Sequence, residues 1–426
     1  MSLPRLLLVA GCLAALLMNG CGNSSNDQAN VRALNLISGA SGVKITAGGT
    51  TIMTGGSFET LTGFTGIGAG NQEFKVTLAG STGTLVDLIY SLSSGISFSF
   101  VTTGTPGATI AVLLADVYTT PSGSNFAFRV LDMSLVATVI DVYLTDPGAD
   151  IATATPVVTA ASFGSPTLFV NTPSGSRQMR ITTTGTKTVI YDALVNFGAG
   201  TGQTLVTYGR GSGTLVNAAI LASNTTGGIV DNTLAQFKVA NGTAVGAPLN
   251  IKVDGTTAVS NLAPAAIAPY QTLAAGTRQI TVESSASPGA TLLTIAPNFV
   301  PATDTSIALS GPAGSLASLV LADSNPPVAA GRAQLRVVNI SPDFTAVDVY
   351  ANFGKLVSGL AANTGSANTL VDAASAGTTY QIDFNAAGTT TVVLSVPGLV
   401  LAGGHTYTVY LLGSGPTLAG VLTQDR

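Results

Sequence analysis

One unit of about 100 residues recurs four times along this chain of 426 residues. Each copy opens with a basic residue between apolar neighbours, and these basic residues are Arg32, Arg129, Lys238 and Arg336. Successive basic residues lie 97, 109 and 98 positions apart. The residues 11, 13 and 15 positions further on are apolar in every copy: Val43, Ile45, Ala47, Ile140, Val142, Leu144, Leu249, Ile251, Val253, Val347, Val349 and Ala351. A spacing of two predicts a strand with one buried face, in the same register in each copy.

The rest of each copy consists of short apolar and Thr-containing runs separated by Gly, Ser, Asn and Pro. Helical periodicity is absent, and the 50 glycines would weaken helices. We therefore predict an all-β chain, a tandem array of four Ig-like β-sandwich repeats with roughly seven strands each. "Ig-like" describes the architecture only, because the chain has no Trp and lacks the cysteine pair of Ig domains. The recurring basic residue is expected on a solvated strand face.

Turn-forming stretches rich in Gly, Pro, Ser, Thr and Asn separate the copies. We place the four sandwiches at residues 30–122, 123–228, 229–328 and 329–426. A signal peptide at residues 1–20 and a polar tether at residues 21–29 are expected to precede them.

The N-terminal segment has the features of a bacterial lipoprotein export signal. A short basic start precedes an uncharged apolar run, Leu6 to Met18, which is too short to cross a bilayer as a helix. Leu16 to Cys21 (LLMNGC) resembles a lipobox, and Cys21 is the predicted lipidation site, with Cys12 as the rival acceptor. The alternatives are an ordinary secretory signal and an uncleaved anchor. Gly22 after the cysteine, in place of Asp, favours sorting to the outer membrane.

Composition excludes some classes of partner. Charged residues make up 8% of the chain, against about 25% in ordinary soluble domains. The net charge is −4 and no basic cluster occurs, so no nucleic-acid partner is expected. Few charges also leave few obstacles to pairing at sheet edges, which predicts self-association or an envelope protein partner through β-edge pairing, beside the membrane bound through the N-terminal lipid.

The fourth copy resembles a known bacterial family. Its stretch Leu335 to Tyr350 (LRVVNISPDFTAVDVY) is similar to the V-R-V-V-H-x-S-P-D-A-P-x-V-D-V-Y opening of the domain of unknown function 4397. This chain departs from the motif at Asn339, which replaces the histidine, and at Phe344-Thr345. The resemblance implies exported, often membrane-anchored β-sandwich modules, and it implies no reaction.

The residue types of catalytic sites are scarce, and no catalytic, cofactor-binding or metal-binding residue is predicted. His405 is the sole histidine and follows two glycines, so it is expected at the start of a strand. Asp343 and Asp348 could contribute to a calcium or ligand site, but a turn at Asp343 is the favoured interpretation. Asp348 and its equivalent in the second copy, Asp141, are expected on a solvated outer strand face. Gly198 to Gly202 (GAGTG) is expected to form a hairpin loop, since it lacks the Lys-Ser/Thr of a phosphate loop.

These observations predict a non-catalytic, membrane-anchored lipoprotein of the cell envelope that acts as a structural, spacer or adhesive protein. The alternative is an envelope module that binds a glycan or peptide through a concave aromatic or acidic patch on one repeat. Ten Tyr residues keep a glycan site open, although Trp, the usual platform for a sugar ring, is absent. A hydrolase built on His405 is a distant third candidate.

Overall fold

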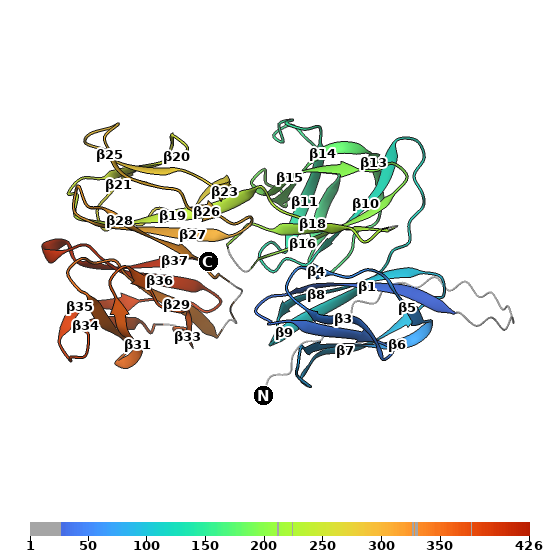
Figure 1. Cartoon of the computed structure of the whole chain (residues 1–426), viewed down its shortest axis with the longest axis horizontal. Coiled ribbons are helices and arrows are strands. Elements are labelled where there is room, and N and C mark those ends of the chain that lie inside the picture. The colour runs from blue at the N-terminus through green and yellow to red at the C-terminus, as the bar shows by residue number, and fades with distance from the viewer. Residues whose placement is uncertain (1–26, 211–212, 224, 326–327, 329–330, 376) are drawn as a thin grey trace.

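The computed structural model describes residues 27–210, 213–223, 225–325, 328, 331–375 and 377–426, and it is all-β, as predicted (Figure 1). Four sandwiches follow one another along the chain, and each has an inner and an outer sheet. The inner sheet contains the first strand of each copy, and the outer sheet contains the strand with the three predicted apolar positions. Nine of those twelve residues are buried, and Leu144, Val253 and Ala351 pack partly buried against the cores.

The first sandwich contains nine strands, of which β4, β5, β1, β8 and β9 form the inner sheet and β3, β2, β6 and β7 the outer sheet. Their bounds are β1 (Gln28–Ile37), β2 (Val43–Ala47), β3 (Thr50–Gly56), β4 (Thr60–Leu61), β5 (Thr65–Gly68), β6 (Gly70–Leu78), β7 (Thr84–Leu92), β8 (Ser97–Thr105) and β9 (Ala108–Ala115).

In the second sandwich, the inner sheet has the order β13-β10-β16-β17-β18 and the outer sheet the order β12-β11-β14-β15. The bounds are β10 (Asn125–Asp132), β11 (Val139–Thr145), β12 (Val158–Ser162), β13 (Val170–Pro173), β14 (Gly175–Thr183), β15 (Val189–Phe197), β16 (Gly202–Tyr208), β17 (Asn217–Ala222) and β18 (Gly228–Val230).

The third sandwich has the inner sheet β22-β19-β27-β28, the outer sheet β21-β20-β24-β25 and a small ladder between β23 and β26. The bounds are β19 (Leu234–Thr243), β20 (Leu249–Val253), β21 (Thr256–Leu262), β22 (Gln271–Ala274), β23 (Gly276–Thr277), β24 (Ile280–Ser284), β25 (Thr291–Ile295), β26 (Asn298–Phe299), β27 (Asp304–Gly311) and β28 (Ala317–Ala322).

The fourth sandwich has the inner sheet β32-β29-β36-β37, with β33 also on β29, and the outer sheet β31-β30-β34-β35. The bounds are β29 (Arg332–Asn339), β30 (Ala346–Ala351), β31 (Gly354–Ala361), β32 (Thr364–Gly365), β33 (Thr369–Asp372), β34 (Tyr380–Ala386), β35 (Val392–Leu399), β36 (Thr406–Leu412) and β37 (Ala419–Gln424), with one 3-10 turn at Gly415–Thr417.

The sandwiches pack in two pairs through their inner sheets (Figure 1). On β1, Val31 and Ala33 face the core of the first sandwich, whereas Leu34 and Leu36 belong to a separate apolar cluster shared with Leu131 and Val206 of the second. An equivalent cluster joins the third and fourth sandwiches; it contains Ala240, Ala308, Val338, Ile340, Tyr410 and Leu412. The central strands of each inner sheet are therefore buried on both faces, whereas the edge strands β9, β28 and β37 remain partly exposed. Each pair forms a double unit joined by an apolar cluster.

This pairing overturns the expectation that the recurring basic residue is solvated. Arg32 is 0% exposed, and Arg129, Lys238 and Arg336 are also buried, because the face of the inner sheet that carries them is covered by the neighbouring sandwich. The stretch at Gly198 to Gly202 also differs from expectation: it links β15 of one sheet to β16 of the other, so it crosses between sheets and is no hairpin loop.

Within the described residues, no helix is long and apolar enough to cross a membrane.

Candidate functional site

The most unusual polar feature of the chain is a cluster of charged side chains inside each double unit. In every copy the basic residue of the first inner strand lies beside a Ser or Thr of the parallel neighbouring strand, and these hydroxyl residues are Ser99, Thr204, Ser306 and Thr408. The strand that follows in each inner sheet is β9, β17, β28 or β37. The residue directly after this strand donates its N–H to the carbonyl oxygen of the residue two positions before the hydroxyl residue, and these donors are Asp116, Ser223, Asp323 and Asp425. Three copies thus place an aspartate near the buried cation, and the second copy places a serine.

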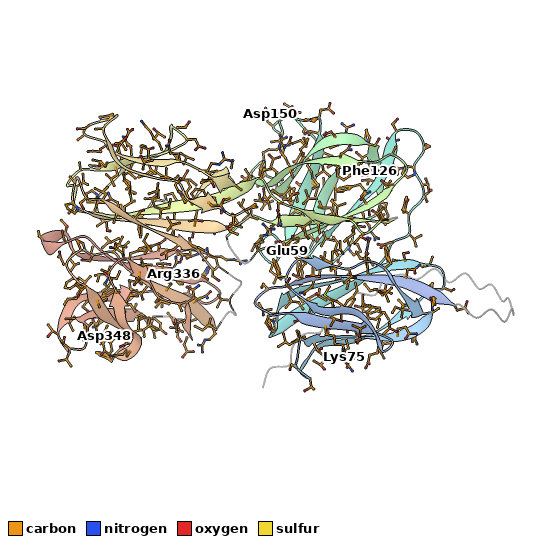
Figure 2. The ribbon with its side chains drawn as sticks, in the orientation of Figure 1. Glu59, Lys75, Phe126, Asp150, Arg336 and Asp348 are labelled. Carbon is orange, nitrogen blue, oxygen red and sulfur yellow. The ribbon has the colours of Figure 1, made fainter. Side chains whose placement is uncertain are left out.

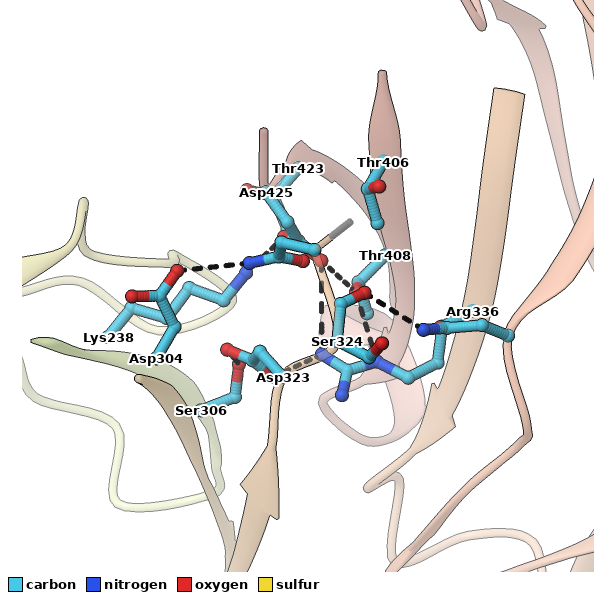
Figure 3. Close-up of polar contacts among 12 residues, drawn as sticks. Lys238, Asp304, Ser306, Asp323, Ser324, Arg336, Thr406, Thr408, Thr423 and Asp425 are labelled. Carbon is cyan, nitrogen blue, oxygen red and sulfur yellow. Dashed lines mark hydrogen bonds and ion pairs between the residues drawn. The ribbon is translucent and has the colours of Figure 1, made fainter. Parts of the chain in front are cut away.

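In the second double unit, the cations and acids are exchanged between the two sandwiches (Figure 3). Lys238 of the third sandwich forms an ion pair with Asp425 of the fourth. Reciprocally, Arg336 of the fourth lies 2.7 Å from Asp323 of the third. Hydroxyl groups complete the network, because Ser306 donates to Asp323 and Thr408 to Asp425. Figure 2 places Arg336 at the junction of the two sandwiches, away from the outer surface.

In the first double unit, one acid pairs with both basic residues of the buried cluster, as far as the described residues show. Asp116 lies between Arg32 and Arg129, at nitrogen–oxygen distances of 3.0 and 3.2 Å, and Ser99 Oγ donates to it at 2.7 Å. Ser223 occupies the place of the second acid, and its hydroxyl oxygen is buried without a hydrogen-bond partner in the described part of the chain. Arg32 instead donates to the carbonyl oxygens of the second sandwich at Ala222, Thr225 and Thr226.

Burial dominates the electrostatics of these clusters. It raises the pKa of Asp116 and lowers the pKa of both Arg32 and Arg129, while their mutual attraction acts in the opposite direction. Such ion pairs add little net stability relative to apolar side chains of the same size, but leaving one partner unpaired costs about 3–5 kcal/mol. The clusters therefore fix how the sandwiches are matched more than they stabilise them.

Two further acids, Asp132 and Asp304, are buried, and the Lys238 ammonium group lies near Asp304 (Figure 3). Burial raises the pKa of Asp132 and of Asp304 to about 7 in each case. One carboxylate oxygen of each, Oδ2 of Asp132 and Oδ1 of Asp304, has no hydrogen-bond partner among the described residues. A neutral, protonated carboxyl suits both sites.

Asp132 stands where the other three copies have asparagine. The equivalent position, three residues after the basic residue, is occupied by Asn35, Asn241 and Asn339. The side-chain amide nitrogen of each donates to a backbone carbonyl oxygen near the end of β3, β21 or β31, the second strand of the outer-sheet hairpin that follows. Asp132 retains the acceptor role, since Thr207 Oγ1 donates to Oδ1 at 2.6 Å and the Ser134 N–H at 2.9 Å. As a carboxylate it lacks the donor.

Further contacts join the two double units. Arg210 of the second sandwich pairs with Glu59 of the first at 2.7 Å and donates to the Pro301 carbonyl oxygen of the third at 3.0 Å. Arg426 at the C-terminus donates to the Leu135 carbonyl oxygen of the second sandwich at 3.2 Å. Side chains of all four sandwiches thus contribute to one connected body.

The residues singled out from the sequence do not come together into a site. Cys21 and Cys12 lie outside the described residues. His405 directly precedes β36, and its Nδ1 lies 3.0 Å from the Arg426 carbonyl oxygen. Asp343 Oδ2 accepts a hydrogen bond from the Gly415 N–H, and the Asp343 N–H donates to Ser341 Oγ, which places Asp343 in a turn. Among the described residues, no group of three or more His, Cys, Asp or Glu could hold a metal ion.

Asp348 and Asp141 were expected on a solvated face, and this expectation is wrong. Both are buried, and each carboxylate accepts hydrogen bonds from N–H groups of the neighbouring edge strand and of a nearby turn. Asp348 accepts from Gly359 at 2.7 Å and pairs with Lys355 at 2.9 Å, and these contacts hold its pKa down to about 2. Asp141 accepts from Ala160 and Gly185. Both acids therefore brace the outer sheets.

The comparisons with known proteins place the chain in a family. A family model described as "Domain of unknown function (DUF4397)" matches residues 29–143, 235–350 and 333–426. The matches cover most of the chain, which therefore belongs to this family, as the resemblance of the fourth copy predicted. The second sandwich is matched only over its first part.

Other comparisons add no function. No curated protein matches the chain. Among solved structures, "The Bacillus anthracis TIE protein" is similar at 10% sequence identity and a TM-score of 0.16. The alignment covers 88% of this chain and 66% of that one, so the chain spans just under two thirds of its length.

The sequence did carry a signal for the buried clusters. Asp116 in the first copy and Asp323 in the third stand at equivalent positions of the repeat, directly after a strand, and the basic residues also stand at equivalent positions. What the sequence lacked was any indication that the two positions face each other across two sandwiches.

Proposed function

We propose that this chain is a non-catalytic lipoprotein of the cell envelope, anchored through Cys21, in which four sandwiches form a stiff structural, spacer or adhesive body. The observation that supports this function best is the burial of both faces of the central strands of every inner sheet. An array of independent domains would expose one of those faces and bend at its linkers. A body joined by apolar clusters and crossed ion pairs instead holds its four sandwiches at fixed places relative to one another.

The anchor is tested by labelling cells that produce the full chain with a radioactive fatty acid. The full chain is expected to incorporate the label, and Cys21→Ser is expected to lose it and to leave the membrane fraction. Cys12→Ser is the matched control and should label normally. Loss of label in Cys12→Ser together with full labelling of Cys21→Ser would refute the assignment of the anchor.

The envelope location is tested by protease treatment of cells before and after the outer membrane is made permeable. Digestion in intact cells favours an adhesive role at the surface, and digestion only after permeabilisation favours a spacer or scaffold in the periplasm. Resistance under both conditions, with the chain in the cytoplasmic fraction, would overturn the proposal.

Self-association through sheet edges is a separate part of the proposal. The outer sheets end in β7, β15, β25 and β35, which have no further strand beside them among the described residues. A concentration-dependent rise in mass by light scattering is expected, and a strictly monomeric mass at high concentration would exclude edge pairing with itself.

A further inference from the structure

A hairpin tip of the fourth sandwich carries an exposed aromatic ring in an unfavourable backbone conformation. Asn352 and Phe353 join β30 to β31, with φ angles of 46° and 70°. Two successive positive φ angles define a tight hairpin turn that strongly favours glycine at its second position. The first and third sandwiches have glycine there, Gly49 at φ 78° and Gly255 at φ 84°.

Phe353 has an unfavourable backbone conformation at this position, and its side chain is not buried. A side chain in the left-handed region costs about 1–2 kcal/mol relative to glycine, and its ring remains 83% exposed. Burial therefore does not offset the backbone strain. Strain of this kind, retained where the other copies avoid it, points to a role outside folding.

Phe353 lines a hollow of about 540 Å³ on the outer sheet of the fourth sandwich. The hollow is bounded by residues of β30, β34 and β35 and of two turns, and these are Tyr350, Phe353, Gln381, Asp383, Asn385, Thr390, Val392 and Ser395. Tyr350, Asp383 and Ser395 are cross-strand partners in one row across the three strands. Two aromatic rings thus adjoin a floor of carboxylate, amide and hydroxyl groups.

The floor contains hydrogen-bonding capacity that the protein does not use. Asn385 is 7% exposed, and its Oδ1 is buried without a hydrogen-bond partner among the described residues. Leaving such an acceptor unsatisfied costs about 1–3 kcal/mol. Asp383 receives only neutral donors, Gln381 Nε2 at 2.9 Å on both oxygens and Ser395 Oγ at 2.6 Å.

In the first two sandwiches, the residue equivalent to Asp383 is basic and forms an ion pair with the next strand. Lys75 stands where the fourth sandwich has Asp383, and it pairs with Asp87 at 3.4 Å. Arg180 holds the place in the second sandwich and pairs with Asp192 at 3.3 Å. Within the described part of the chain no ion pair involves Asp383, so of these three outer sheets only the fourth has at this position an acid that is bonded to neutral donors alone.

We propose that this hollow is a binding site for a neutral carbohydrate. The exposed ring of Phe353 suits the apolar face of a pyranose ring, and the oxygens of Asp383 and Asn385 would accept hydrogen bonds from sugar hydroxyl groups. Tyr350 borders the site, with Lys355 Nζ 5.3 Å from the centre of its ring. Its volume falls in the usual range of small-molecule sites, about 300–1,000 Å³. The carboxylate disfavours anionic sugars, because the nearest lysine on this hairpin, Lys355, is already paired with Asp348.

This site goes beyond the proposed envelope role and does not depend on lipidation of Cys21. The test uses the full chain and a panel of neutral oligosaccharides of glucose, galactose, mannose and N-acetylglucosamine, screened by saturation-transfer NMR and then titrated calorimetrically. At least one sugar is expected to bind. Absence of binding across the panel, or binding of an oligolysine peptide with no sugar bound, would overturn the proposal.

Phe353→Gly separates binding from folding. The variant should weaken binding by about tenfold, while its melting temperature stays the same or rises, because glycine suits the positive φ. Leu168→Ala, which trims an 88% exposed apolar side chain on the second sandwich, should leave affinity unchanged. Asp383→Asn should weaken the same sugar by removing the charge from its hydrogen bonds. Unchanged affinity in Phe353→Gly and Asp383→Asn would show that the sugar binds elsewhere and refute the site.

Discussion

Asp116→Asn tests whether the buried cluster holds the first double unit together. The substitution keeps the size of the side chain but removes the only acid that lies between Arg32 and Arg129, and all three side chains are at most 9% exposed. Two guanidinium groups would then remain buried without a counter-ion. Breaking a buried pair in this way costs about 3–5 kcal/mol.

The expected shift in melting temperature follows from the size of the cooperative unit. For units of about 150–250 residues, each kcal/mol lowers the melting temperature by about 2–4 °C, so Asp116→Asn should lower it by about 6–20 °C. Differential scanning calorimetry of the full chain measures this shift. The second double unit has its own acids, so only one of two transitions should move.

The matched control is an exposed ion pair of the same chemical type. Asp146 lies 2.5 Å from Arg177 but is 81% exposed, and exposed pairs contribute at most about 1 kcal/mol. Asp146→Asn should therefore leave both transitions nearly unchanged. Equal effects of Asp116→Asn and Asp146→Asn would refute the conclusion that the cluster fixes the pairing of the sandwiches.

The other predictions concern the remaining buried groups. Asp132→Asn should restore the asparagine of the other copies. The folded pKa of Asp132, about 7, lies above the usual 3.8, so the contribution of this residue to stability is full below about pH 4 and falls by up to about 4 kcal/mol as pH rises to 7. Denaturation at several pH values should show this loss in the wild type and a smaller one in the variant; parallel curves would contradict the assignment. Gly227→Ala should destabilise the second sandwich, because a Cβ there would lie 2.0 Å from the Ile220 carbonyl oxygen, whereas Gly185→Ala, with open space around it, should cost only the backbone strain of a positive φ. Comparable losses in the two variants by thermal melting would argue against the clash. Ser223→Asp should supply the missing second acid and make the pairing of the first double unit less sensitive to Asp116→Asn, which a double-mutant cycle would measure.

The alternation of apolar residues was sufficient to predict the outer sheets. Val43, Ile140, Leu249 and Val347 are all buried at the same register position, because a strand in a sandwich needs one face against its own core. Because the four copies share this register, they could be recognised as one repeat and assigned to the all-β class. The family motif of the fourth copy agreed with both.

The inner strands contained a signal that a single-face interpretation missed. Leu34 and Leu36 alternate with Arg32 on one face of β1, and Val31 and Ala33 lie on the other. Apolar residues on both faces are typical of a strand buried on both sides. Taken with the low content of charged residues, this pattern favours packing between sandwiches.

The sequence by itself determined the repeat, the class of fold and the register of the strand that carries the three apolar positions, since these depend on which residues within one strand share a face. Only the tertiary structure decided which sandwiches pair, which acid lies against each recurring cation, and that Phe353 adjoins Asp383 and Asn385. These contacts join residues far apart in the chain, and their burial depends on which surface covers which. A local pattern of side chains can show that a strand face is covered, but it does not say by which partner.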